Sequence, residues 1–414
     1  MSLLESFLLQ LQNYLVASTE NNHNIIRKHT KKLETLGDIS FPSKIDNWHR
    51  LLNKDSISSL RTIFEYNKVD IEQLTSKSAE WTISVSDIRT TESNVHLFLN
   101  RSGETFRAAI CGALTDQENY GFCKIFNYTI CIETTVPDVP VDDMDVSNLR
   151  IHILEGVTNN FIEKFTCKTA SDQCSKITIS QSPLEKANKF ILCGPVVDHE
   201  GKKSTMVAGD LFRKRMSDMR MMAQHKYGVQ FKSNSPWEAY FAKLGRACVT
   251  IELLSNRLQK PIKIAENDLQ TANKGASFIF YNCARLSTLL REFDRRITQN
   301  MYPELPSIEF VDFSLLDQQE EWELLYVYIM QYPMILRDSV KDIEKGIFNP
   351  HNLVIFLSNL CSVFSVYYRR VRVLTDAREH LHGVIHAKIY LLKALQVVFH
   401  NTLFLLNIEP IKEM

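Results

Sequence analysis

The chain has 414 residues, of which 44% are hydrophobic and 23% charged, the balance of a soluble globular protein with room for two or three domains. Lys+Arg and Asp+Glu each number 48, so the net charge alone does not indicate a nucleic-acid partner. No stretch of the sequence approaches the roughly 18 consecutive apolar residues that a membrane-spanning helix needs, and we expect no membrane partner.

The cysteines and the N-terminus predict the compartment. The nine cysteines are odd in number, irregularly spaced and without a Cys-x-x-Cys pair, which predicts reduced thiols. The run from Leu3 to Leu11 carries Glu5 and Gln10 and has no basic leader, so it predicts an amphipathic helix rather than a signal peptide. We therefore expect a soluble, cytoplasmic protein.

Short helices and strands alternate in the first part of the chain. A helix is predicted over about 2–17. Farther along, alternating apolar and polar residues predict strands. A stretch rich in proline and acidic residues predicts a loop. These elements are strands over 81–85 and 95–100, a helix over 106–114, a strand over 128–133 and a loop over 137–145.

The rest of the chain becomes increasingly helical. The middle predicts a helix over 147–165, a polar turn-rich stretch over 166–188, a strand over 190–193 and a basic helix over 210–227. From residue 236 onward, apolar residues recur at steps of three and four, which predicts amphipathic helices. One such stripe comprises Ile279, Cys283, Leu286, Leu290 and Phe293, and another comprises Ile385, Ile389, Leu392, Gln396, Phe399, Leu403 and Leu406.

Basic residues are concentrated in one region of this neutral chain. Residues 201–300 hold 18 Lys/Arg against 8 Asp/Glu, whereas 133–155 and 301–350 are acidic. Such a stripe attracts phosphate even when the whole protein is neutral. A solvated helical surface has the same composition, and both interpretations stay open at this point.

A strand-like run, Ile132-Glu-Thr-Thr-Val-Pro137, is followed by Asn148-Leu149-Arg150 at the start of a predicted helix. This order resembles the region around the ATP-binding signature of arginyl-tRNA synthetases, where His-Ile-Gly-His directly precedes Leu-Arg. Here that place reads Asp145-Val-Ser-Asn148. The resemblance implies that the imidazoles that stabilise charge on ATP are missing, and an aspartate in their place repels phosphate.

Farther along, Glu200-Gly-Lys-Lys-Ser-Thr205 resembles a remnant of the second, Lys-Met-Ser-type signature of the same family. Met206-Val-Ala-Gly209 follows where a basic residue is expected. Only about 55 residues separate the two remnants, whereas a dinucleotide-type fold with an inserted domain needs well over about 100. We therefore predict a shortened nucleotide fold that cannot activate an amino acid, and no enzyme.

Three separated elements occur in order near the C-terminus. They are Phe278-x-x-Tyr281-x-x-Ala284-Arg285, the segment from Phe348-Asn349 through Tyr367-Tyr368 to Arg372-Val-Leu374, and the ending Leu405-Leu-Asn-Ile-Glu-Pro-Ile-Lys-Glu-Met414. They resemble the all-helical DALR anticodon-binding domain of the same family, with departures at Phe280, Cys283 and Asn407. Val95 to Asn100, a helix and then Tyr120-Gly121 resemble the family's N-terminal add-on domain.

Other site chemistries have little support. Around Gly201-Lys-Lys-Ser204, the preceding glycine is too far back for a P-loop and Lys203 stands at the hydroxyl position. His382 and His386 would share a helix face as zinc ligands do, but no acid lies between them and no cysteine is close in sequence. No Gly-x-Ser-x-Gly signature occurs. We predict neither a metal nor a cofactor nor a catalytic residue.

Aromatic and arginine side chains on one helix face suit single-stranded RNA. Aromatics stack on splayed loop bases, and arginines stack on bases or bridge phosphates. The alternative is that the aromatics belong to the core and the arginines are merely solvated. The predicted RNA-binding residues are Tyr281, Arg285, Arg296, Arg213, Lys214, Arg215 and Arg220.

We expect α+β N-terminal and middle regions, a degenerate class I synthetase-like α/β, followed by an all-α DALR-type bundle, with domains at 1–130, 131–235 and 236–414. The chain resembles the DALR anticodon-binding-domain-containing proteins of animals, non-catalytic relatives of arginyl-tRNA synthetase. This resemblance implies an adaptor that recognises arginine tRNAs and presents them to a methyltransferase-like enzyme that makes 3-methylcytidine in the anticodon loop. Two alternatives remain: a divergent arginyl-tRNA synthetase, and an interaction module without RNA binding.

Overall fold

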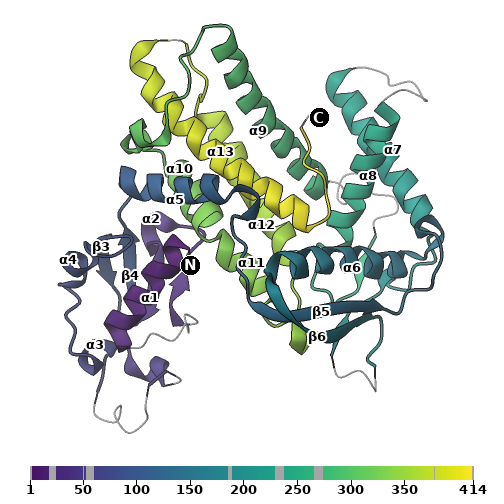
Figure 1. Ribbon diagram of the computed structural model, residues 1–414, viewed down its shortest axis with the longest axis horizontal. Coiled ribbons are helices and arrows are strands. Elements are labelled where there is room, and N and C mark those ends of the chain that lie inside the picture. The colour runs from purple at the N-terminus through teal and green to yellow at the C-terminus, as the bar shows by residue number, and fades with distance from the viewer. Residues whose placement is uncertain are drawn as a thin grey trace. The chain divides into compact units, whose positions relative to one another are not determined.

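The computed structural model describes residues 2–17, 25–49, 51–52, 60–184, 189–228, 237–264, 274–376 and 378–412. The chain forms two compact units, each assembled from three separate segments (Figure 1). Unit 1 comprises Met1–Thr115, Pro303–Tyr332 and Val373–Leu395, and unit 2 comprises Asp116–Tyr302, Pro333–Arg372 and Gln396–Met414. Because these units do not follow chain order, the sequential division at residues 130 and 235 stays a prediction.

Unit 1 contains a four-stranded antiparallel sheet with the strand order β1-β2-β4-β3. Its strands are β1 (Arg27–Lys28), β2 (Ile39–Pro42), β3 (Val85–Thr90) and β4 (Asn94–Leu99). Its helices are α1 (Leu3–Val16), α2 (Leu33–Leu36), α3 (Ile63–Tyr66), α4 (Leu74–Ser78), α5 (Gly103–Asp116), α10 (Gln319–Glu323) and the π-helix η8 (Leu324–Met330). One face of the sheet is apolar and buried, as the alternation in the sequence predicts.

Asp38 connects this sheet to the helices from the later part of unit 1. Its carboxylate accepts hydrogen bonds from the Trp322 indole and the Leu99 backbone, both at 2.8 Å, and its carbonyl accepts one from the Tyr326 hydroxyl at 2.6 Å. Burial raises the pKa of the Asp38 carboxyl, against the effect of these bonds. This buried network is therefore what fixes α10 and η8 to the sheet.

Unit 2 combines parallel strands with helices. A three-stranded sheet has the order β5 (Phe126–Thr134), β6 (Thr166–Ser180) and β7 (Phe190–Leu192). A separate two-stranded sheet pairs β8 (Val196–Val197) with β9 (Ile262–Lys263). The helix α6 (Val146–Phe165) links β5 to β6 and lies along their sheet, as a parallel pair requires (Figure 1). The other helices are α7 (Ala208–Tyr227), α8 (Trp237–Leu253), α9 (Lys274–Thr298), α11 (Tyr332–Val340) and α12 (His351–Arg370). The last helix, α13 (His382–Leu405), is shared, because the boundary between the units falls after Leu395.

Most predicted elements are confirmed. The residues of the predicted stripes on α9 and α13 are buried, except Gln396, which is partly exposed, and both helices bury further residues, such as Phe280 and Leu395. Two predictions about elements are wrong. The stretch over 166–188, expected to be turn-rich, contains the 15-residue strand β6, which pairs with β5 and β7; residues 185–188 lie outside the described residues. The strand expected over 81–85 begins only at Val85.

The expectation of uniformly reduced thiols is also corrected. Cys131 on β5 and Cys174 on β6 are joined by a disulfide, because the parallel pairing brings the two positions together. The seven other cysteines are not part of a disulfide. Spacing along the chain gave no indication of this pair, whose members are 43 residues apart.

Candidate nucleic-acid interface

The first helical turn of α6 is closed by a side chain of the protein. Asp145 is its N-cap, and one carboxylate oxygen accepts hydrogen bonds from the backbone N–H groups of Ser147 and Asn148 at 2.9 and 3.0 Å. The other oxygen accepts from the Asn148 side chain at 2.7 Å. Helix N-termini attract anions through such N–H groups. Here a carboxylate already occupies them, at the place where the resemblance puts the ATP signature.

Arg150, the arginine that follows this place, has a structural role in the fold. Its side chain is completely buried and donates to the backbone carbonyls of Leu253, Gly194 and Lys260 at 3.0, 2.6 and 2.9 Å. Burial lowers the pKa of the guanidinium. Arg150 thus holds α6, the end of α8 and the loop before β9 together, and it points away from solvent.

The loop that resembles the second signature is a tight turn closed on itself. One oxygen of Asp198 accepts from the backbone N–H groups of Glu200 and Lys202, both at 2.9 Å, and the Lys202 ammonium lies 2.8 Å from the Glu200 carboxylate. Gly201 has φ of +85°, a conformation that favours glycine. The basic charge of Lys202 is therefore paired with an acid two residues away.

The predicted RNA-binding residues on the basic helix α7 differ in their burial. Arg215 is buried, with 1% of its side chain exposed, and donates to Glu252 at 2.8 Å through two nitrogens and to Asp218 at 3.1 Å. Its guanidinium is committed to two carboxylates inside the protein. Arg215 therefore does not belong to a surface that could bind RNA, and its place in the predicted site is corrected.

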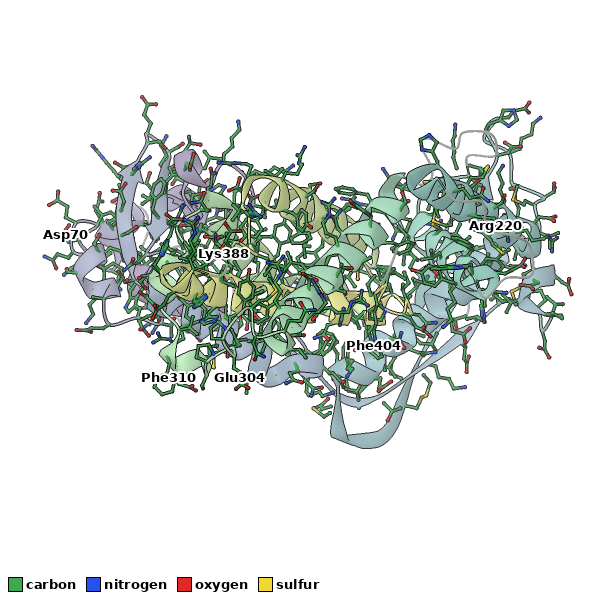
Figure 2. All side chains as sticks on the ribbon, turned by 90° about the horizontal axis from the view of Figure 1, so that it is seen from above. Asp70, Arg220, Glu304, Phe310, Lys388 and Phe404 are labelled. Atoms are coloured by element: carbon green, nitrogen blue, oxygen red, sulfur yellow. A yellow bond between two sulfur atoms is a disulfide. The ribbon has the colours of Figure 1, made fainter. Side chains whose placement is uncertain are left out.

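The other three predicted RNA-binding cations of α7 differ in how far they reach the surface. Arg213 is exposed and pairs with Asp210 at 2.6 Å; Lys214 is partly exposed. Arg220 is mostly covered and lies 3.3 Å from Glu238 at the start of α8 (Figure 2). The exposed pair of Arg213 with Asp210 contributes little to stability, so Arg213 remains available to a polyanion.

A cleft of about 1090 Å³ lies within unit 2, between α6, α8, α9 and residues 407–412. Four cations line it, Lys243, Arg246, Arg291 and Lys412, together with the acids Glu155 and Glu409. The Arg246 guanidinium stacks 4.2 Å from the Phe212 ring and bonds Asp142 at 3.1 Å, and Lys243 pairs with Glu409 at 2.9 Å. The basic region recognised in the sequence thus contributes three of these cations to the cleft, in addition to those on the surface of α7. The sequence did not single out any of the four.

A compact group of aromatic and basic side chains lies where α9 packs on α12. The Arg285 guanidinium lies 4.3 Å from the Tyr281 ring and 4.4 Å from the Tyr368 ring, and it donates to the Tyr281 hydroxyl. Tyr368 is 40% exposed, and Arg369 and Arg370 follow it on the surface at the end of α12. We call Tyr281, Arg285, Tyr368, Arg369 and Arg370 the arginine–tyrosine cluster.

The sequence identified two of the five residues of this cluster. Tyr281 and Arg285 are four residues apart on one helix, so their contact follows from helical spacing. Tyr368, Arg369 and Arg370 were missed as site residues, although the run Tyr367-Tyr368-Arg369-Arg370-Val-Arg372 is a visible signal of aromatics beside cations. Their approach to Arg285 depends on the packing of α9 against α12.

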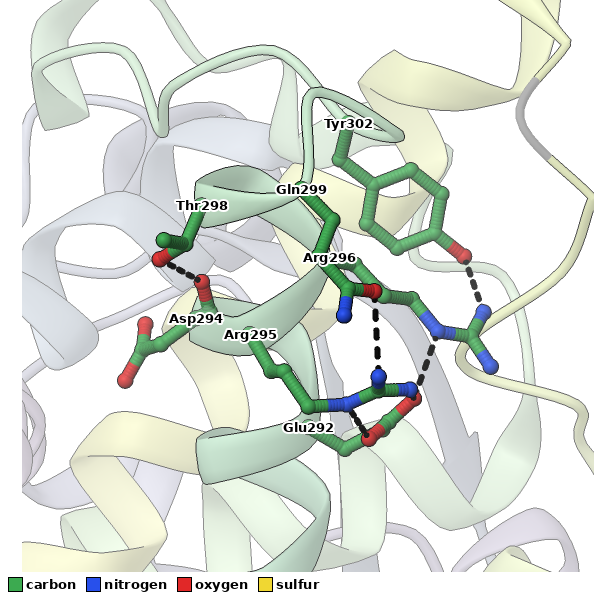
Figure 3. A network of polar contacts seen from close by, with 7 residues as sticks. All are labelled: Glu292, Asp294, Arg295, Arg296, Thr298, Gln299 and Tyr302. Carbon is green, nitrogen blue, oxygen red and sulfur yellow. Dashed lines mark hydrogen bonds and ion pairs between the residues drawn. The ribbon is translucent and has the colours of Figure 1, made fainter.

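Arg296 lies in a separate network at the end of α9 (Figure 3). Its guanidinium donates to Glu292 at 2.9 Å and to the Tyr302 hydroxyl at 2.8 Å, and Arg295 binds the same carboxylate at 2.7 and 2.8 Å. Hydrogen bonds from Arg295 and then Arg296 lower the pKa of Glu292 to about 2. Two cations share one acid here, and Arg295 is the more exposed of the two.

The histidine pair considered as a metal site is a stacked pair on α13. The rings of His382 and His386 lie 6.3 Å apart, and burial lowers the pKa of His386. No group of three or more His, Cys, Asp or Glu suited to a metal ion occurs among the residues that the structure describes. Within the same residues, every helix is too short or too polar to cross a bilayer.

Comparison with known proteins supports the resemblance of the C-terminal region. Residues 279–414 match the family model described as DALR anticodon binding domain, and they contribute helices to both units. A protein of Danio rerio named DALR anticodon-binding domain-containing protein 3 is 31% identical over 236 residues, covering 55% of this chain and 42% of that protein. Its namesake in Rattus norvegicus is 29% identical over 286 residues, covering 67% and 50%. The matched region thus spans half or less of these curated relatives.

The arginyl-tRNA synthetase resemblance extends to sequence and fold. The arginine–tRNA ligase of Borreliella burgdorferi is 27% identical over 163 residues, covering 39% of this chain and 25% of the ligase. The structure of the arginyl-tRNA synthetase of Plasmodium falciparum superposes with a TM-score of 0.65 at 9% identity and covers 100% of each chain. The fold class predicted from the sequence, an α/β region with a parallel sheet and a helical DALR-type region, is confirmed.

Proposed function

We propose that this protein is a non-catalytic, cytoplasmic tRNA-binding adaptor that recognises arginine tRNAs. The arginine–tyrosine cluster is the observation that carries this proposal, because it joins stacking surfaces to cations within the region that matches an anticodon-binding family. Loop bases stack on tyrosine and on arginine planes, and neighbouring arginines bind the adjoining phosphates. Following the resemblance, we further propose that the bound tRNA is presented to a methyltransferase that makes 3-methylcytidine in the anticodon loop.

The basic cleft and the surface of α7 supply a second set of contacts in this proposal. Lys243, Arg246, Arg291 and Arg213 would hold backbone phosphates, which positions the RNA without reading its sequence. The cluster on α9 and α12 would then read the loop. The runner-up is an interaction module that keeps the fold without binding RNA, for which the paired state of many of these cations is the favouring observation.

The arginine–tyrosine cluster gives a quantitative test. Replacing Arg285 with alanine is expected to weaken the Kd for arginine tRNA by about tenfold or more, since one stacking contact is worth about 1–3 kcal/mol. Arg285→Lys keeps the charge but not the stacking plane and should recover only part of the loss. Filter binding or fluorescence anisotropy measures both, with the exposed Lys345→Ala as control. Equal affinities for all four proteins would remove the cluster from the interface.

The proposal of non-catalysis predicts that arginine-dependent exchange between ATP and pyrophosphate stays at background. The Asp145 carboxylate occupies the N–H groups at the start of α6 and would repel a phosphate there. An Asp145→His variant should be equally inactive, because one imidazole does not rebuild the signature. A bona fide arginyl-tRNA synthetase serves as positive control. Exchange by the wild-type chain would establish a divergent synthetase instead.

Sequencing of the tRNAs that crosslink to the protein tests the proposal as a whole. We expect arginine tRNAs to be enriched over bulk tRNA, and 3-methylcytidine in those tRNAs to fall when the protein is depleted. Enrichment no greater than the bulk control would favour the interaction module. Enrichment with unchanged 3-methylcytidine would retain RNA binding and refute the methyltransferase step.

A further inference from the structure

Phe310 is the most exposed large hydrophobic side chain that the structure describes. It ends the short 3-10 helix η6 (Ile308–Phe310) and is 83% exposed, whereas the other exposed side chains of this class lie between 36% and 48%. In Figure 2 it projects from the same edge of unit 1 as Glu304. Scattered apolar side chains are common on surfaces, but a nearly complete phenyl ring in water is costly and uncommon.

The segment that carries Phe310 is fixed on both sides. Before it, the Pro306 carbonyl accepts a hydrogen bond from the Tyr390 hydroxyl at 2.7 Å. After it, the Val311 carbonyl accepts one from Arg107 at 2.9 Å, and the buried Phe313 ring packs edge-on against Tyr390. All of these partners belong to unit 1. The ring is therefore presented by an ordered backbone, and binding it costs little conformational entropy.

The surroundings of Phe310 are acidic. Between Pro303 and Tyr332 the chain has seven Asp/Glu and no Lys or Arg. Four of these acids are exposed and lie within seven residues of Phe310 in the sequence: Glu304, Glu309, Asp312 and Asp317. A bond from Ser307 lowers the pKa of Glu309, and bonds from Ser314 lower that of Asp312, so both are ionised at neutral pH. Arg107 adds one positive charge nearby, and it is itself bonded to Glu104.

This combination selects between two macromolecular partners. An exposed aromatic could stack on a base, but the carboxylates around Phe310 would repel the adjoining phosphates. A protein surface with cations around an apolar pocket satisfies both the ring and the acids. An aromatic anchor surrounded by a polar rim is the usual arrangement of a binding hot spot.

We propose that Phe310, with Glu304, Glu309, Asp312 and Asp317, forms a docking patch for a basic protein surface that carries a pocket of phenyl size. This inference rests on the proposed function, and it names the methyltransferase as the occupant. An enzyme that modifies tRNA carries a basic surface to hold RNA, and that charge complements the docking patch. The adaptor then uses different residues for its two partners: cations for the tRNA and the docking patch for the enzyme.

The test measures binding of the purified full-length chain to the purified methyltransferase and, separately, to arginine tRNA. Phe310→Ala should weaken the Kd for the enzyme by more than about tenfold and leave the Kd for tRNA unchanged. A Glu304→Lys/Glu309→Lys pair should weaken enzyme binding and reduce its salt dependence. Ile355→Ala, which removes an exposed apolar side chain on α12, is the matched control and should change neither.

Photo-crosslinking identifies what contacts the ring directly. With p-benzoylphenylalanine at position 310, a crosslink to the methyltransferase supports the docking patch, and a crosslink to tRNA overturns it. Enzyme binding that survives Phe310→Ala also overturns it. If the wild-type chain binds tRNA but not the enzyme, the docking patch fails while RNA recognition stands. If the wild-type chain binds the enzyme but not tRNA, the docking patch stands and the proposal of RNA recognition fails.

Discussion

Replacing Arg215 with methionine is expected to lower the free energy of unfolding by about 3–5 kcal/mol, because two carboxylates would lose their counter-charge inside the protein. Asp218 and Glu252, 5% and 10% exposed, are the groups left behind. Arg213→Met on the same helix should change stability by less than about 0.5 kcal/mol, since its ion pair lies on the surface. Chemical denaturation followed by circular dichroism compares the two variants.

The same pair of variants separates stability from RNA binding. Arg213→Met should reduce the slope of log affinity for tRNA against log salt by about 1, because one phosphate contact is lost. A triple variant Arg215→Met/Asp218→Asn/Glu252→Gln removes the buried charges together and should recover part of the stability. If Arg215→Met folds normally and binds tRNA with a reduced salt slope, the interpretation of Arg215 as a buried structural residue is wrong.

Arg150→Met is the second substitution with a large expected effect. It would leave three backbone carbonyls without donors in a dry interior, and at about 1–3 kcal/mol for each unsatisfied group the loss should be at least about 3 kcal/mol. Arg150→Lys supplies donors without the planar fork and should retain part of the stability. The exposed Arg295→Met is the control.

The interpretation of Arg150 also predicts how the wild-type chain responds to nucleotide. If the arginine only holds α6 to its neighbours, added ATP should leave the thermal midpoint of unfolding unchanged, because a ligand stabilises only the state that it binds. A midpoint that rises with ATP concentration would indicate a nucleotide site that α6 has retained.

Elements whose pattern is local could be predicted from the sequence. The stripes on α9 and α13 repeat at helical spacing, so the burial of their apolar residues could be predicted. The burial of residues outside the stripes, such as Phe280 and Leu395, could not. The strand β6 was not, because its first half, Thr166-Cys-Lys-Thr-Ala-Ser-Asp-Gln-Cys, is polar and is a strand through its pairing with β5. A polar strand stabilised by a partner some 40 residues away has no local signature.

The candidate site divides in the same way. The contact of Tyr281 with Arg285 follows from a spacing of four, whereas Tyr368 joins them through the packing of two helices. Arg213 and Arg215 lie two positions apart, and the local sequence does not tell which of the two side chains is buried. The burial of Arg215 is decided by Glu252, which lies on α8, 37 residues farther along the chain. The exposure of Phe310 likewise depends on Arg107 and Tyr390, which hold its backbone in place.

The Asp145 cap at the start of α6 affects which substitutions the protein could tolerate at this position. An aspartate cap contributes roughly 1 kcal/mol to its helix, so a histidine reintroduced at position 145 would cost stability before it could restore any chemistry. Recovery would need several substitutions at once, each neutral or harmful alone. Under the proposed function, the place that the resemblance assigns to a reaction centre is part of the framework of the fold, and a return to catalysis would be difficult. Selection can then act on the recognition surfaces without regard to nucleotide chemistry.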